Sequence, residues 1–411
     1  MKILFTFENA LPNTEADAEV FITTARYLGG HLEAGWLHAP VKRRNRHIAA
    51  GLVNMPVIRA WALPKPAILR HFMCGLTIGL RPVFHKVDLV YTRNLWVAWL
   101  SLLYGQRVVF DHYRPWPDQI PPLQRWLYRL FTHPRFLGSV CHSEYTRQKY
   151  IELGVPPEKL RCIHNGFEPR RFQSPLTPEA AKKLIGLAED AKTIVYTGRV
   201  NHKKGLELVI EAARLLPHLT FLLVGSYGEG PIEAMARQLH NVIVVPWQTE
   251  ETLGNYIHAA DVLLIPPSLQ PLAKFGTTVL PLKLFFYLGS GRPILAGNTP
   301  DVAEVLKQNE TALLCAPDSL AALVDGLKTL TDDESFANRL AANAKLDSRN
   351  YTWSARAEKI HATISSWLAM EATARPGHWG TAQQSAWKRG SRRWFRHFIR
   401  TRTVTLPPGE A

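Results

Sequence analysis

Apolar positions fall in short continuous runs that alternate with longer segments of helical periodicity. Three runs, Lys2–Phe7, Val87–Tyr91 and Arg107–Phe110, have the length and composition of buried strands. Two segments, Glu15–Leu28 and Leu95–Leu103, have the length and spacing of helices. Because strands that alternate with helices form parallel sheets, this half of the chain predicts an α/β domain.

A second series of the same kind begins at Thr193 and predicts a second doubly wound domain. The expected strands are Thr193–Thr197, Leu219–Val224, Val242–Val245, Val262–Ile265 and Pro293–Ala296. The expected helices are Leu206–Leu216, Pro231–Leu239, Leu253–Ala260 and Leu282–Leu288. We expect Gln173–Ala191 to be a linker, and the proline-rich segment Tyr113–Pro122 to be a loop, since proline removes backbone donors and stops helices.

These patterns divide the 411 residues into three parts that differ in charge. Residues 1–172, the first domain, carry a net charge of +11. Residues 173–370, the second domain with a terminal helix that we expect to cross back to the first, carry −2, and residues 371–411, a basic aromatic tail, carry +6. Because one domain is near-neutral, this distribution indicates that particular basic faces contact an anionic ligand or surface. Phospholipid headgroups, nucleotide phosphates and nucleic acid are the candidates.

Cysteine usage and hydropathy indicate a reducing compartment. The four cysteines are far apart and contain no CxxC motif, so they predict neither a disulfide framework nor a zinc site. Only five mainly apolar residues follow Lys2, too few for a signal peptide, and the run Leu95–Gly105 is too short to cross a bilayer. We therefore expect a cytoplasmic protein, either soluble or peripheral at the inner face of the cytoplasmic membrane.

The segment Tyr196–Gly205 (YTGRVNHKKG) carries the clearest chemical signal. It lies between an expected strand and an expected helix and contains a glycine, Gly198, where backbone can approach a ligand, and the cations Arg199 and Lys204. A strand end, cations and a helix N-terminus together form a cradle for a diphosphate. Taken alone, the segment could equally be a solvated basic turn, with Arg199 and Lys204 paired to Glu207 or Glu211.

Two further segments strengthen the diphosphate interpretation. Phe275–Pro293 (FGTTVLPLKLFFYLGSGRP) is a polar loop that enters a helix ending at a glycine, and Lys283 falls in the first helical turn, where free N–H groups favour an anion. Upstream, Cys162–Glu168 (CIHNGFE) reads as a strand end followed by an Asn-Gly turn.

With these segments in order, the sequence resembles the retaining glycosyltransferases of family 4 (group 1), over roughly residues 1–365. The matching residues are Val140–Ser143, Leu153–Val155, Ile163–Glu168 with Phe172, Thr197–Arg199 with Lys204 and Gly205, Leu223–Gly225, Ala260–Val262 with Pro267 and Ser268, Pro281–Phe285 with Tyr287, Gly291–Pro293, and Trp353. The resemblance implies a GT-B fold, in which two Rossmann-like domains face each other across a cleft, with the nucleotide sugar on the second domain and the acceptor on the first.

The resemblance also implies roles for particular residues. Arg199 and Lys204 would hold the donor diphosphate and neutralise the leaving nucleotide, so that neither a metal nor a cofactor is expected. Gly198, Thr278 and Lys283 would complete the donor site. The family commonly brings a histidine from the first domain to the transferred sugar, and His112 is the candidate here, with a structural role as the alternative.

The sequence departs from the family in two places. Family members carry two glutamates before the Gly-Arg-Pro segment, but the corresponding positions hold Thr278 and Phe286, or Ala273 and Pro281 in the other register. The paired glycines of the family's first loop are also absent, because Leu11–Asp17 occupies that place. We expect an altered or weakened grip on the donor, and low activity, an unusual donor and loss of catalysis all stay open.

Aromatic and basic residues in the tail suggest a membrane. Trp387, Trp394 and Phe398 recur at helical spacing among arginines, as in a helix lying on an anionic leaflet. A helix packed on the first domain and a disordered basic end are the alternatives. With the run Lys42–His47 in the first domain, the charge favours a lipid-linked or otherwise anionic glycan acceptor.

Four functions remain open from the sequence. The leading one is transfer of a sugar from a nucleotide sugar to a glycan or lipid-linked acceptor with retention of configuration. The others are a sugar-nucleotide epimerase or phosphorylase, a catalytically silent scaffold that binds a nucleotide sugar, and nucleic-acid binding, for which no known module is present.

Overall fold

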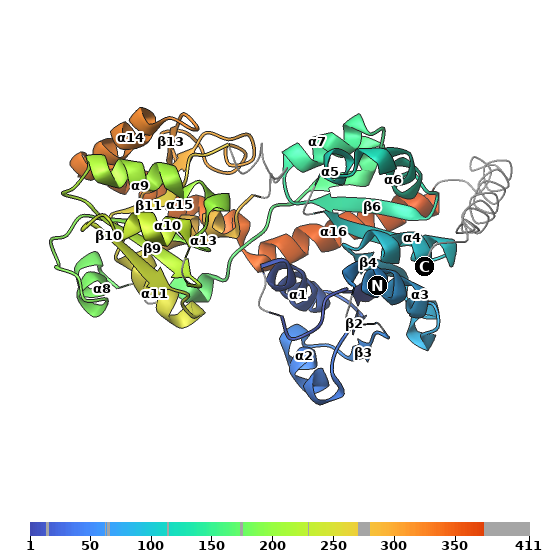
Figure 1. The fold of residues 1–411 in the computed structure, drawn as a ribbon. Coiled ribbons are helices and arrows are strands. Elements are labelled where there is room, and N and C mark those ends of the chain that lie inside the picture. Colours follow the sequence, from blue (N-terminus) through green and yellow to red (C-terminus); the bar gives the residue numbers. More distant parts are fainter. Residues whose placement is uncertain are drawn as a thin grey trace, which may run out of the picture. The chain divides into compact units, whose positions relative to one another are not determined.

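The computed structural model describes residues 1–13, 16–61, 63, 66–112, 115–172, 176–228, 230–269 and 280–373 (Figure 1). Packing distinguishes two units, Met1–Ile364 and Ser365–Ala411. The first unit contains two parallel β-sheets, one built before residue 172 and one after it.

The first sheet has seven strands in the order β3-β2-β1-β4-β5-β6-β7, and every pairing is parallel. Its strands are β1 (Lys2–Thr6), β2 (Ala34–Ala39), β3 (Val57–Arg59), β4 (Leu89–Thr92), β5 (Val108–His112), β6 (Phe136–Cys141) and β7 (Leu160–Cys162). All residues of β4, β5 and β6 are buried, as expected for a parallel sheet covered on both faces.

In the described residues, eight α-helices accompany this sheet or follow it before the second. They are α1 (Ala16–Gly29), α2 (Arg46–Val53), α3 (Ala67–Ile78), α4 (Leu95–Leu103), α5 (Trp116–Gln119), α6 (Gln124–Phe131), α7 (Glu144–Glu152) and α8 (Pro178–Leu184). Helix α4 begins where predicted because Asn94 caps it, accepting hydrogen bonds from the backbone N–H groups of Trp96 and Val97 at 2.9 and 3.0 Å.

The second sheet has six parallel strands in the order β10-β9-β8-β11-β12-β13. They are β8 (Thr193–Thr197), β9 (Thr220–Ser226), β10 (Val242–Pro246), β11 (Val262–Ile265), β12 (Ile294–Gly297) and β13 (Leu313–Cys315). The accompanying helices are α9 (Leu206–Leu215), α10 (Pro231–Ala236), α11 (Glu250–His258), α13 (Leu282–Ser290), α14 (Leu320–Asp332) and α15 (Glu334–Asp347). The last described helix, α16 (Trp353–Thr373), crosses back to the first domain, where Arg356 pairs with Asp111 and the ring of His361 lies 5.7 Å from that of His31.

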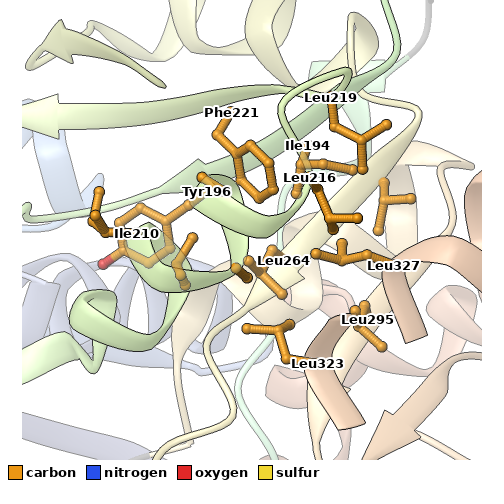
Figure 2. Packing of buried hydrophobic residues seen from close by; sticks show 14 of the residues in the cluster. Ile194, Tyr196, Ile210, Leu216, Leu219, Phe221, Leu264, Leu295, Leu323 and Leu327 are labelled. Atoms are coloured by element: carbon orange, nitrogen blue, oxygen red, sulfur yellow. The ribbon is translucent and has the colours of Figure 1, made fainter. Parts of the chain in front are cut away.

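One core of this domain lies between its sheet and α9, α10 and α14. Figure 2 shows Tyr196 and Phe221 from the strands among Leu264, Leu295, Leu323 and Leu327, all of them buried. Helix α9 contributes Leu206, Val209, Ile210 and Ala213, which recur every three or four positions. This periodic face was the signal from which the helix was predicted.

Both sheets have a switch point. Successive strands are first added on one side of the domain's first strand, β1 or β8, and later strands are added on its other side. In the first sheet the switch point lies between β1 and β4, and in the second between β8 and β11. Ligands of open α/β sheets bind beyond the carboxyl ends of the strands at such points. The segment after β8, which begins with Gly198 and Arg199, is therefore at the expected place for a ligand.

Two predictions about irregular segments were wrong. Within the predicted loop Tyr113–Pro122, residues Trp116–Gln119 form α5, because Pro117 occupies the first helical turn, where no N–H donor is needed. Within the predicted linker Gln173–Ala191, Pro178–Leu184 form α8, capped by Thr177, whose side chain accepts a hydrogen bond from the N–H of Ala180 at 3.3 Å.

The unit Ser365–Ala411 is described only as far as Thr373, where α16 ends. The aromatic and basic residues Trp387, Trp394 and Phe398, from which a membrane-binding tail was predicted, lie outside the described residues. Among the helices that the structure describes, none is both long and apolar enough to cross a membrane.

Candidate functional site

The backbone beyond β8 comes unusually close to the backbone beyond β9. Gly198 and Gly225 both have left-handed backbone angles, φ +128° and +119°, and the Gly198 N–H donates to the carbonyl of Val224 at 2.8 Å. A Cβ atom at Gly225 would lie 2.4 Å from the Gly198 carbonyl oxygen. Glycine is required at both positions. At the carboxyl ends of β8 and β9 the backbone therefore carries no side chain at these two points.

Lys283 lies against this edge from the first turn of α13. Its Nζ is 3.6 Å from the ring centroid of the buried Tyr196, and a Cβ at Gly198 would lie 2.8 Å from the same atom. The helix is held to β8 by Tyr287, whose hydroxyl accepts a hydrogen bond from the N–H of Thr197 at 2.9 Å. The glycine therefore makes the space that the lysine head group occupies.

Burial and a neighbouring cation keep the pKa of Lys283 well below its usual value. Burial is the larger cause, because it disfavours the charged ammonium, and the positive charge of Lys204 adds to it. The side chain remains partly accessible. A ligand with negative charge would relieve both effects.

Arg199 and Lys204 lie on the exposed side of the same edge. The Arg199 guanidinium is 5.2 Å from the ring centroid of Tyr227, and its carbonyl accepts a hydrogen bond from the Tyr196 hydroxyl at 2.9 Å. Lys204 ends the short helical turn η6 (His202–Lys204), immediately before Gly205 and α9. Desolvation, followed by the charges of Arg199 and Lys203, lowers the pKa of Lys204.

These three cations, Arg199, Lys204 and Lys283, form the β8 cationic edge. In the described part of the chain, none of them forms an ion pair with a carboxylate, and the pairing with Glu207 or Glu211 that the sequence left open does not occur. Three uncompensated cations near two helix N-termini can hold an anion with several oxygens, such as a diphosphate.

The family's two carboxylate positions are only partly described. Thr278, predicted for the donor site, and Ala273 lie outside the described residues. Phe286 is partly buried on α13 and packs against the apolar core on that side of the sheet. It also lines a cavity of about 390 Å³ together with Arg170, Phe172, Glu251, Leu253, Gly254 and Ile257.

His112 occupies an interior position in the first domain. It is fully buried at the end of β5, its Nε2 is 2.9 Å from Ser139 Oγ, and its ring lies 3.8 Å from that of Tyr150. Burial holds its pKa well below the usual value. The described structure offers a sugar no exposed surface of His112, so the structural role that the sequence left as the alternative is the one the geometry favours.

Asp111, the neighbour of His112, is the centre of a compensated charge cluster. Its two carboxylate oxygens pair separately with Arg93 at 2.7 Å and Arg356 at 3.2 Å, and all three side chains are at most 2% exposed. Burial alone would raise the pKa of Asp111, but Arg93 and then Arg356 lower it overall. Sequence reasoning missed this cluster because Arg356 is 245 residues away.

Cys162, His164 and Glu304 place one candidate metal-ligand atom each within 4.8 Å of one another. The Glu304 carboxylate already accepts hydrogen bonds from the backbone N–H groups of Glu144 and Tyr145 at 2.6 and 2.7 Å. Burial also raises the pKa of the Cys162 thiol to about 12, and a metal would need the thiolate. The geometry fits a cap at the start of α7 better than a metal site.

Comparison with known proteins identifies both domains. Residues 15–171 match the family model for Glycosyltransferase Family 4, and residues 179–347 match that for Glycosyl transferases group 1. The two matches together cover most of the chain and leave the tail unmatched.

Among curated relatives, the lipopolysaccharide core biosynthesis mannosyltransferase LpsB of Rhizobium meliloti (strain 1021) is 28% identical over 218 residues, 50% of this chain and 60% of LpsB. The amylovoran biosynthesis glycosyltransferase AmsK of Erwinia amylovora is 26% identical over 232 residues, 53% of each chain. The chain spans about half the length of the curated relatives it matches.

Among solved structures, HepE of Anabaena in complex with UDP-glucose has a TM-score of 0.70 at 17% identity, covering 89% of this chain and 100% of that one. The lipopolysaccharide glycosyltransferase WaaG has a TM-score of 0.63 at 16% identity, covering 88% and 99%. At this level of identity the similarity concerns the fold, which is GT-B, as predicted.

Proposed function

We propose that this chain, which belongs to the group 1, family 4 glycosyltransferases, transfers a sugar from a nucleotide-sugar donor to a glycan or lipid-linked acceptor of the cell envelope. The observation that carries the proposal is the β8 cationic edge, three cations without a carboxylate partner in the described structure, at the switch point of a parallel sheet. Two of the relatives are named for amylovoran biosynthesis and for lipopolysaccharide core biosynthesis, which supports the acceptor class.

In this proposal the cations act mainly on the leaving group. As the bond from the sugar carbon to the diphosphate breaks, negative charge grows on the departing oxygen. Arg199 and Lys204 stabilise that charge, and an anion beside Lys283 raises its lowered pKa and so favours its ammonium form. The reaction then needs no metal. A hydroxyl group of the acceptor attacks the sugar carbon on the face from which the diphosphate leaves, and its proton passes to the departing phosphate oxygen, which gives retention.

Release of nucleotide from a panel of nucleotide sugars tests the proposal. The variant R199A/K204A should lose at least about 100-fold in release rate, the usual effect of removing groups that stabilise a developing charge. The matched control is K192A/R214A, which removes the same charge from exposed residues at the other ends of β8 and α9. We expect the control to retain activity, and chelator to have no effect on it.

A nucleotide-dependent rise in melting temperature without release of nucleotide would instead support the silent scaffold, to which Phe286 in place of a carboxylate points. Equal rates in R199A/K204A and in the control would overturn the proposal. The configuration of the product, followed by NMR, tests retention separately. In the proposed setting the protein works at the inner face of the cytoplasmic membrane, where lipid-linked acceptors are available.

A further inference from the structure

Exposed apolar side chains are concentrated in one part of the first domain. The described residues include 18 large apolar side chains with high exposure, and eight of them lie between Ile48 and Leu80. Among these eight, the most exposed are Leu80 at 79%, Trp61 at 66% and Ile68 at 65%. Scattered exposed apolar residues are normal, but a concentration on neighbouring elements indicates an interaction surface.

Hydrogen bonds hold several of these residues together around the end of α3. The hydroxyl of Thr77 donates to the carbonyl of Met73 at 2.9 Å, and the carbonyl oxygen of Trp61 lies 3.4 Å from the same Oγ1. The hydroxyl of Tyr104 donates to the carbonyl of Leu76 at 3.2 Å. Leu80 follows Leu76 by four positions. The four exposed residues Trp61, Leu76, Leu80 and Tyr104 thus surround one helix end, and we refer to them as the α3 patch.

The apolar surface continues toward the start of α3. Ile68 and Leu69 are exposed there, and Ile68, Phe72 and Leu76 are four residues apart, which places them on one face of the helix. Inside, Cys74 and Ile78 on the opposite face are fully buried in the core of the domain. Helix α3 therefore has a buried apolar face, and on its other side Ile68, Leu69 and Leu76 are exposed, while Phe72 is half-buried against the ring of Trp96 at 5.6 Å.

The stretch of sequence that carries the α3 patch is basic. Between Glu33 and Asp88 the sequence contains no acidic residue, but nine lysines and arginines. Arg81 lies beside the patch, where its guanidinium donates to the carbonyl of Arg59 at 3.0 Å, and the exposed run Lys42–Arg44 belongs to the same stretch. Exposed cations such as Lys42–Arg44, from a stretch of sequence that contributes no carboxylate, are suited to an anionic partner.

We propose that the α3 patch docks this protein on an anionic lipid bilayer. Tryptophan, tyrosine and leucine side chains enter the boundary between headgroups and acyl chains, while arginine and lysine beside them contact the lipid phosphates. The one-sided charge favours a lipid surface over a second copy of this chain, which would bring the same cations to the contact. The proposal rests on the part of the proposed function that places the protein at a membrane, and it assigns the contact to the first domain.

Co-sedimentation of the full chain with vesicles tests this docking surface. Wild type should bind vesicles of phosphatidylcholine and phosphatidylglycerol, bind pure phosphatidylcholine at least 10-fold more weakly, and lose affinity as salt rises. W61E/L80E should reduce binding to the anionic vesicles at least 10-fold. The matched control is L184E/L346E, which changes two similarly exposed leucines, on α8 and α15.

Nucleotide release without vesicles is the readout of the proposed function in the same variants. We expect W61E/L80E to retain release at the wild-type rate, which also shows that it is folded, so loss of binding and loss of activity can be told apart. Equal vesicle binding by W61E/L80E and L184E/L346E would overturn the proposal. It would also be overturned if W394S/F398S alone abolished binding, or if W61E/L80E dissociated a dimer of the wild-type chain.

Discussion

The two domains use positive charge in opposite ways. In the first, Arg93 and Arg356 are buried and each pairs with one oxygen of Asp111. In the second, Arg199, Lys204 and Lys283 gather at a strand edge with no carboxylate partner in the described residues, and the pKa values of the two lysines are lowered. A cluster whose charges are balanced within the fold stabilises structure, whereas one left unbalanced is available to a ligand.

The largest effect is expected when the negative charge of Asp111 is removed from between Arg93 and Arg356. Asp111→Asn leaves two buried guanidinium groups without a counter-charge, and removing one partner of a buried ion pair typically destabilises a protein by about 3–5 kcal/mol. Chemical denaturation should show a loss of this size. The control Glu152→Gln removes a carboxylate from the exposed pair with Lys149 and should change stability by less than about 1 kcal/mol.

Glu8 is a buried carboxyl group in the first domain, and it tests whether a buried charge that is not fully compensated destabilises the fold. Burial, as the largest cause, raises its pKa to about 7, and one of its carboxylate oxygens has no hydrogen-bond partner in the structure. The folded state therefore binds the proton more tightly than the unfolded state does, and stability falls as pH rises from about 4.5 to 7.

Glu8→Gln should remove that dependence. Above pH 7 the variant should be more stable than wild type by up to about 3 kcal/mol, and the difference should shrink toward pH 4.5. Unfolding curves at several pH values measure it. A variant that is less stable than wild type at pH 8 would show that the ionised carboxylate has a favourable partner.

Lys283→Met should separate stability from ligand binding in the second domain. Because the pKa of Lys283 is lowered in the folded state, its ammonium opposes folding at pH 7, and this effect disappears above the ordinary lysine pKa, where the unfolded side chain is also neutral. The variant should melt at a higher temperature at pH 7, yet bind a nucleoside diphosphate about 10-fold more weakly. A variant that loses both properties would show that Lys283 is structural.

Local sequence signals predicted much of the fold. Strands Thr193–Thr197 and Val262–Ile265 and helix Leu95–Leu103 have the predicted bounds, because buried apolar runs and a capping asparagine are local features. The helical turns within the proline-rich segment and the linker were missed, because proline in a first helical turn looks like proline in a loop.

The site was predicted less completely, because only the folded chain shows which charged side chains pair with an opposite charge. Motif and spacing located Gly198, Arg199, Lys204 and Lys283, but the contact of Lys283 with Tyr196 joins residues 87 positions apart. Nothing in the local sequence around His112 distinguishes a buried histidine from an accessible one. The separation between Asp111 and Arg356 likewise hides their pairing from any local pattern.

Calorimetric titration with UDP and GDP tests the central claim, that the β8 cationic edge binds a diphosphate, most directly. Wild type should bind at least one of them and take up protons on binding, because the anion raises the lowered pKa values of Lys204 and Lys283, and its affinity should therefore fall as pH rises. R199A/K204A should lose at least about 100-fold in affinity, while K192A/R214A stays within about twofold of wild type. Equal affinities in the two variants, without proton uptake in wild type, would contradict the account.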